Sequence, residues 1–152
     1  MIRVQQTAFD AAQELKMFQD AHRASGATVM FIGTVRELSE GRRIEGMTLE
    51  HYPGMTEKAL AEIEAEALKR WPLTASLIVH RHGRLLPGDD IVLVITASAH
   101  RQAAFEACSF LMDWLKTKAP FWKLEESAGG ARWVEAKDHD DEAARRWDRR
   151  AS

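Results

Sequence analysis

Two lysines on either side of a proline are the first candidates for chemistry in this sequence. Lys116 and Lys123 flank Pro120, and the apolar pair Phe121-Trp122 falls between them. Lysines at the end of a helix commonly do no more than complement its macrodipole. Beside apolar surface and other cations, however, the charged form of an amine is disfavoured, and this is one way in which a lysine becomes a catalyst. The spacing alone leaves a structural and a catalytic interpretation open.

A second cluster of polar residues, Ser98 to Arg101, stands where a predicted strand at 91–97 meets a predicted helix at 101–118. The first N–H groups of a helix lack backbone partners, and the positive end of its macrodipole lies there, so an anion is favoured. His100 and Arg101 would add donors. The sequence is therefore equally consistent with a phosphate site and with an ordinary solvated helix start.

Arg36 is a third candidate, at the end of a predicted strand at 27–36 that contains Gly33. A glycine allows a ligand or another segment to approach the backbone closely. Arginine at a strand end is commonly only solvated. Taken with the two lysines, His100 and Arg101, it predicts a cationic pocket for a small phosphorylated molecule.

Other chemistries have little support. His80 and His82 would share a strand face, but no third ligand stands at a suitable spacing, so we expect two strand residues and no metal site. Cys108 falls on an apolar helix face, where a thiol is unreactive. Phosphate-loop, dinucleotide-binding, zinc-protease and nucleophile-elbow motifs are absent from the sequence, and no cofactor is expected.

Length and composition limit the class of protein. The chain has 152 residues, of which 45% are hydrophobic and 29% charged, so a single domain spanning 1–152 is expected. The net charge of −2 argues against nucleic acid as a partner. No apolar run approaches the roughly 18–20 residues that cross a bilayer. With a single cysteine and no signal-peptide pattern at the start, we expect a cytoplasmic protein that does not bind membranes.

The periodicity predicts an α+β layout dominated by antiparallel pairing. We expect strand 27–36 to be covered on both faces, residues 37–43 to form a mobile loop, and strands 75–82 and 91–97 to form a hairpin. Asp10 and Thr56 are expected N-caps, and Ala104, Phe105, Cys108, Leu111, Met112 and Leu115 are expected to face the core. The predicted helices are 11–25, 56–71, 101–118 and 138–150, and the remaining predicted strands are 2–5, 47–52, 121–126 and 132–137.

At this level of detail the chain resembles the large, catalytic subunit of molybdopterin synthase. The similarity extends over almost all of residues 26–147. It is carried by long motifs: FIGTVR at 31–36, LEHYPGMTEKAL at 49–60, HRHGRLLPGD at 80–89, SAHRQAAFEA at 98–107, MDWLKTKAPFWK at 112–123 and RWVEAK at 132–137. The resemblance implies an α/β-hammerhead fold with an additional antiparallel β sub-sheet.

The same resemblance implies an activity and its residues. Members of the family make molybdopterin from cyclic pyranopterin monophosphate, taking two sulfurs from the C-terminal Gly-Gly thiocarboxylate of a small ubiquitin-like subunit. Carried over position by position, Lys116 and Lys123 are catalytic. Substrate-binding positions are Thr34, Val35, Arg36, His100, Arg101, Lys116, Lys123, Leu124 and Glu125, and pocket-lining positions are Phe31, Met112 and Lys137. Leu124 replaces a basic residue that is usual in the family, and Lys137 replaces an arginine found in some members.

The resemblance also implies partners: a homodimer within a heterotetramer that carries one ubiquitin-like sulfur-carrier subunit at each end. We hypothesise that Lys116 meets the carrier's terminal acyl group, whereas Lys123 supports opening of the cyclic phosphate. The alternative is a non-catalytic module that only binds a ubiquitin-like partner or a phosphorylated metabolite. Such a module would need a groove but neither lysine.

Overall fold

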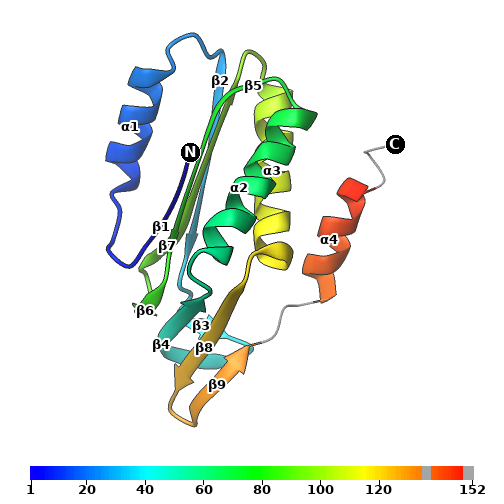
Figure 1. Cartoon of the computed structure of the whole chain (residues 1–152). Helices are drawn as coiled ribbons and strands as arrows, with labels where there is room; N and C mark the ends of the chain where they lie inside the picture. Colours follow the sequence, from blue (N-terminus) through cyan, green and yellow to red (C-terminus); the bar gives the residue numbers. More distant parts are fainter. Residues whose placement is uncertain (135–137, 149–152) are drawn as a thin grey trace.

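The computed structural model describes residues 1–134 and 138–148. The helices in this part of the chain are α1 (Ala11–Ala21), α2 (Met55–Arg70), α3 (Arg101–Lys118) and α4 (Asp138–Asp148). The strands are β1 (Ile2–Gln5), β2 (Ala27–Thr34), β3 (Leu38–Ser39), β4 (Arg42–His51), β5 (Leu73–Arg81), β6 (Gly83–Leu85), β7 (Asp90–Ser98), β8 (Phe121–Ser127) and β9 (Gly130–Val134). Within these residues the strands form two sheets, so the predicted α+β class is confirmed (Figure 1).

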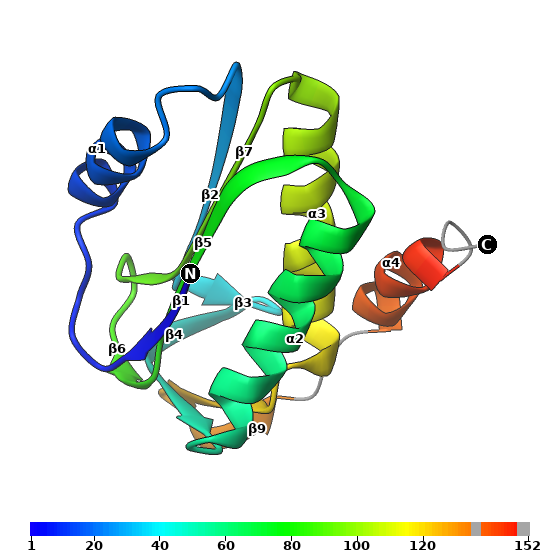
Figure 2. The ribbon, with the colours of Figure 1, turned by 45° about the horizontal axis from the view of Figure 1, so that its top comes forward.

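The first sheet, called here the β7 sheet, has the strand order β1-β5-β7-β2. β7 pairs antiparallel with β5, as the predicted hairpin requires, and with β2, whereas β1 runs parallel to β5. Helix α1 covers one face through Phe18, and α2 and α3 cover the other through Leu60 and Phe110 (Figures 1 and 2). The predicted N-cap of α1 is confirmed, because the carboxylate of Asp10 accepts a hydrogen bond from the backbone N–H of Gln13 at 3.0 Å.

The second sheet, called here the β8 sheet, has the order β3-β4-β8-β9, and β6 also pairs with β4. All of its ladders are antiparallel. It corresponds to the additional sub-sheet that was expected, and it lies beyond one end of the β7 sheet in Figure 1. Its own apolar cluster joins Ile44, Met47 and Leu49 of β4 to Leu85 and Val35.

The strand predicted at 27–36 differs from expectation in position and length. β2 ends at Thr34 and forms an edge of its sheet, and the side chains of Met30 and Phe31 are each 37% exposed. β7 is covered on both faces, and so is the middle of β5. An apolar run in the sequence does not show whether its strand lies at the edge or at the centre of a sheet. The order of the strands depends on pairing between distant segments.

Two local predictions were wrong. Residues 37–43 do not form an irregular loop: β3 turns through Glu40 and Gly41, both with positive φ, into a β4 that begins at Arg42. Thr56 is not the N-cap of α2, which is Gly54. The Thr56 side chain is fully buried in the first turn, where its hydroxyl donates to the carbonyl of Tyr52 at 2.8 Å.

The predicted buried face of α3 is confirmed at Ala104, Cys108, Leu111 and Leu115, but it is wrong at Phe105. Phe105 is 61% exposed, whereas Phe110, which was not assigned to the core, is fully buried. Phe110 is surrounded by the rings of Trp71, Trp114 and Trp147. Because these rings come from distant segments as well as from α3, the periodicity of α3 alone could not show which side would be covered.

Helix α4 packs against α3 through its last turn. The indole N–H of Trp147 donates to Asp113 at 2.7 Å, and Arg146 donates to the same carboxylate at 2.8 Å. Lys137 and the end of the strand predicted at 132–137 lie outside the described residues, as does the end of the predicted last helix. None of the helices in residues 1–134 and 138–148 combines the length and apolar character of a membrane span.

Candidate active site

The proline between the two lysines brings them to one place. The residue before a proline is disfavoured in the helical region, and Ala119 is accordingly extended, at φ −80° and ψ 136°. Helix α3 therefore ends at Lys118, and β8 begins directly at Phe121. Lys116, on the last turn of the helix, and Lys123, two residues into the strand, both border one cavity.

This cavity has a volume of about 430 Å³ and lies where α3 meets both sheets. It contains many of the residues that the sequence singled out. Of the site residues expected above, those that line it are Phe31, Thr34, Val35, Arg36, Met112, Lys116, Lys123 and Glu125. Its cations are therefore contributed by three separate segments: the end of β2, the end of α3 and β8.

Two of the expected binding residues are unsuited to contact a ligand through their side chains. Val35 is 5% exposed, and its N–H and carbonyl are already bonded to Asp89 and Gly88. It forms part of the wall. Leu124 does not line the cavity, because alternation along β8 turns it to the face opposite Lys123 and Glu125.

His100 and Arg101 are not brought to the cavity of their own chain. Both are exposed at the N-terminus of α3, and His100 is its N-cap without a side-chain capping bond. At 1.5 Å per residue, Arg101 lies roughly 22 Å along the helix from Lys116. The single cleft expected for all of these residues is therefore wrong for one chain, and the two groups occupy opposite ends of α3.

Several lining residues were missed by the sequence analysis. Ser39 was expected in a loop, His80 was expected to be an ordinary strand residue, and Asp140 comes from the distant helix α4. No sequence signal pointed to Ser39 or Asp140. For His80 a signal existed in the near-continuous apolar run of β5, in which a histidine must be enclosed by neighbours.

His80 forms an apolar part of the wall despite its ring nitrogens. It stacks on Phe121 with ring centroids 3.8 Å apart and an interplanar angle of 16°. Its Nδ1 lies 2.8 Å from the carbonyl of Arg81 and donates to it. Burial lowers the pKa of His80 to about 4, and the nearby His51, His82 and Lys116 act in the same direction. The imidazole is therefore neutral at physiological pH.

The low pKa of His80 predicts that the fold loses stability in mild acid. Since the folded-state pKa of about 4 lies below the ordinary 6.5, the unfolded chain binds the additional proton between these values. The stability is complete above pH 6.5 and falls as the pH decreases toward 4, by up to about 3 kcal/mol from this residue. Urea unfolding at several pH values measures the effect.

His80→Asn is the matched control for this prediction, because asparagine keeps a donor for the Arg81 carbonyl but does not titrate. The free energy of unfolding of the variant should change less between pH 7 and 4.5 than that of the wild type. The pKa of His82 is also lowered, chiefly by desolvation, and its effect remains in both proteins. Identical pH profiles would show that His80 does not titrate as described.

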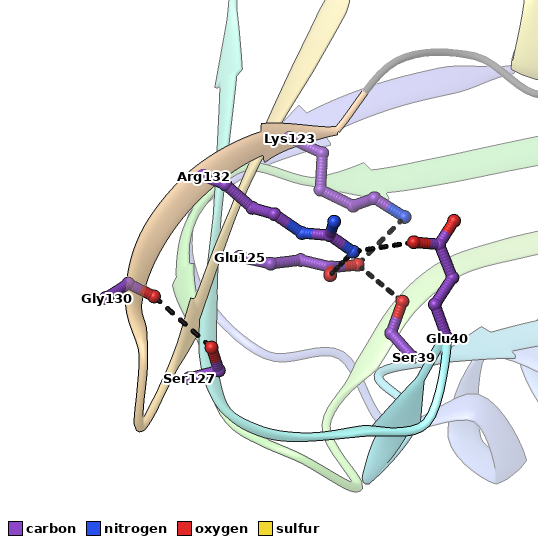
Figure 3. A network of polar contacts seen from close by, with 7 residues as sticks. All are labelled: Ser39, Glu40, Lys123, Glu125, Ser127, Gly130 and Arg132. Atoms are coloured by element: carbon purple, nitrogen blue, oxygen red, sulfur yellow. Dashed lines mark hydrogen bonds and ion pairs between the residues drawn. The ribbon is translucent and has the colours of Figure 1, made fainter.

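Glu125 is an anion beside the lysines, and Asp140 lines the same cavity. The Glu125 side chain is 5% exposed, and its Oε1 lies 3.6 Å from the Nζ of Lys123 and accepts a hydrogen bond from the hydroxyl of Ser39 at 3.2 Å. Its Oε2 lies 4.0 Å from Arg132, which also forms an ion pair with Glu40 at 2.9 Å (Figure 3). The carboxylate thus stands between two cations.

The cysteine has the environment that the sequence predicted. Cys108 is 5% exposed within the core cluster that α2 and α3 form with the β7 sheet. Burial raises the pKa of its thiol to about 11. A thiol of this kind supplies almost no thiolate near neutral pH. Among the described residues, no group of three His, Cys, Asp or Glu side chains is arranged to hold a metal ion.

Comparison with known proteins gives the family. The family model described as "MoaE protein" matches residues 4–118. The molybdopterin synthase catalytic subunit of Pseudomonas aeruginosa is 59% identical over 147 residues, which cover 97% of this chain and 98% of that protein. The chain belongs to the MoaE family.

Solved structures of MoaE-related proteins have the same fold. A MoaE protein from Burkholderia ambifaria superposes with a TM-score of 0.83 at 51% identity, with 97% of each chain covered. Molybdopterin synthase from Staphylococcus aureus gives a TM-score of 0.79 at 32% identity, over 88% of this chain and 96% of that one. The α/β-hammerhead with an added sub-sheet, expected from the motifs, is thereby confirmed for this MoaE-family chain.

Proposed function

We propose that this chain is the catalytic subunit of a molybdopterin synthase and acts as a sulfurtransferase on cyclic pyranopterin monophosphate. The observation that carries the proposal is the convergence of Arg36, Lys116 and Lys123 on one cavity whose other walls are largely apolar. A cavity of this kind can bind a phosphorylated heterocycle and exclude water from a reactive acyl group. Membership of the MoaE family supports the same conclusion.

The sulfur is brought by the C-terminal thiocarboxylate of a small ubiquitin-like carrier. Its sulfur bonds to a carbon of the substrate, and the carbon–oxygen bond at that carbon breaks: at one carbon the oxygen stays on the opened phosphate, and at the other it leaves as water. Addition of water to the acyl group then breaks the acyl–sulfur bond. Sulfur stays on the pterin side chain, and the carrier leaves as a carboxylate. Two such cycles give the dithiolene. The unreactive Cys108 agrees with a carrier of this kind, because the chain itself offers no thiolate for the transfer.

The cations of the cavity have separate tasks in this mechanism. Lys116 meets the terminal acyl group of the carrier and stabilises the negative charge that develops there during transfer. Lys123 supports opening of the cyclic phosphate, and Arg36, exposed at the rim, orients the phosphate. His100 and Arg101 can reach the same ligand only from a second copy of the chain, which is a reason to propose a homodimer within a heterotetramer.

Reconstitution tests the function and the role assigned to the cysteine together. The purified chain, a thiocarboxylated ubiquitin-like carrier and the cyclic precursor should yield the dithiolene product, detected by mass spectrometry. Cys108→Ala should retain the rate within about twofold, because its thiol is protonated and enclosed. Tight binding of the carrier without product would support the non-catalytic binding module instead. A large loss of rate in Cys108→Ala would assign the sulfur to the chain itself.

A further inference from the structure

We propose that Arg132 and Ser39 are positioning residues: they hold the carboxylate of Glu125, and through it the ammonium group of Lys123, beside the cavity. The inference rests on the proposed function, because it concerns the same reaction. Neither residue was among those that the sequence singled out. Arg132 does not line the cavity, so its effect on the reaction must pass through another side chain.

Sheet register brings the four groups together. Lys123 and Glu125 are two residues apart on β8 and therefore share a face. Arg132 of β9 is the direct cross-strand partner of Glu125. Ser39 reaches the same carboxylate from β3, at the far side of β4 (Figure 3). Three strands thus fix one buried carboxylate.

The distances indicate that the carboxylate is shared and not committed to one partner. Glu125 lies 3.6 Å from Lys123 and 4.0 Å from Arg132, and both separations exceed hydrogen-bond length. Within residues 1–134 and 138–148, its Oε2 is buried without a hydrogen-bond partner. The hydroxyl of Ser39 donates a hydrogen bond to Oε1 at 3.2 Å. Arg132 is held in turn by Glu40 at 2.9 Å.

This sharing has a consequence for Lys123. While Arg132 attracts one side of the carboxylate, Glu125 is kept from closing onto Lys123, and the ammonium group stays beside the cavity, where it faces an incoming phosphate. Without Arg132, Glu125 would draw the ammonium group of Lys123 into a closer pair. The residues around a reacting group commonly set its position in this way, and their loss lowers the rate without removing the reacting group.

The experiment compares Arg132→Gln with Arg84→Gln in the reconstituted synthase. Arg84 is a matched control, because it pairs with a carboxylate of the same strand, Glu126, at 3.0 Å but outside the cavity. We expect Arg132→Gln to lower kcat by about tenfold, with KM for the precursor changed by less than about threefold. Arg132→Lys should recover most of the rate, and Arg84→Gln should leave it unchanged.

A double variant tests whether Arg132 acts through Glu125. In a Glu125→Gln background, adding Arg132→Gln should change kcat by less than about twofold, since the charge on which it acts is gone. If the two substitutions instead lowered kcat by factors that multiply, the proposal would be overturned. Equal kcat values for Arg132→Gln and Arg84→Gln while the wild type turns over normally would overturn it too. Absence of wild-type turnover would instead overturn the proposed function, and this inference with it.

Ser39→Ala keeps the proposal testable if Arg132→Gln does not fold. It removes the hydrogen bond from the Ser39 hydroxyl to Oε1 and should lower kcat by about threefold, while KM and the thermal midpoint remain near the wild-type values. Suppose that Arg132→Gln does not fold and that folded Ser39→Ala has the wild-type kcat. The positioning role would then be overturned, and Arg132 would contribute only to the stability of the fold.

Discussion

Replacing Lys116 by alanine is expected to reduce dithiolene formation in the reconstituted synthase by about a thousandfold, because the charge that develops at the carrier's acyl group loses its nearest cation. The substitution removes no core contact, since the side chain is exposed in the cavity. Single-turnover assays with thiocarboxylated carrier and precursor measure the loss. Binding of the carrier should change far less than the rate, because the amine acts on charge that appears only during transfer.

Lys118→Ala is the matched control for this experiment. Lys118 lies on the same last turn of α3 and is also exposed, but its ammonium group rests over the ring of Trp114, 3.3 Å from the centroid, and does not line the cavity. Its loss should leave the rate within about twofold of the wild type. Equal losses in the two variants would indicate a general effect of positive charge on carrier binding. Near-normal turnover by Lys116→Ala would remove this lysine from the mechanism.

Replacing Phe110 by alanine should produce the largest loss of stability, about 3–5 kcal/mol in the free energy of unfolding. The ring is fully buried and lies 4.4 Å from the ring of Trp114 and 5.2 Å from that of Trp71, centroid to centroid. The guanidinium of Arg70 also lies 4.9 Å from its centre. A cavity bounded by several large rings cannot close by a small shift of one neighbour. Urea unfolding followed by tryptophan fluorescence measures the change.

Leu68→Ala provides the comparison, because Leu68 is 47% exposed on the neighbouring helix α2. Its loss should alter the free energy of unfolding by less than about 1 kcal/mol. If Phe110→Ala were equally mild, the aromatic cluster between α2, α3 and α4 would contribute little to stability. The buried face of α3 would then have to be assigned again.

The elements whose boundaries carry strong local signals could be predicted from the sequence. Asp10 caps α1, and Pro120 ends the region of α3. Each of these depends on the conformational preference of one residue. The errors have a different origin. The exposure of Phe105 and the edge position of β2 depend on which distant segments pack beside them, and no local pattern contains that information.

The candidate site was predictable to a similar extent. Lys116 and Lys123 could be recognised together because a turn of known geometry separates them by only a few residues. Arg36 was grouped with them as a cation at the end of a strand that contains Gly33, and the cavity contains all three. His100 and Arg101 were wrongly grouped with the lysines, although the helix predicted at 101–118 already separates them. Residues at the two ends of a long helix are remote in space even when they are near in sequence.

The arrangement of the two sheets also affects how the cavity can move. One wall comes from β2 and β7 and another from β4 and β8, and no strand belongs to both ladders. Sliding of one sheet against the other would widen the entrance without breaking a single interstrand bond. The amides of β7 and of β8 can therefore stay protected from hydrogen exchange while the cavity between them widens to admit a peptide tail.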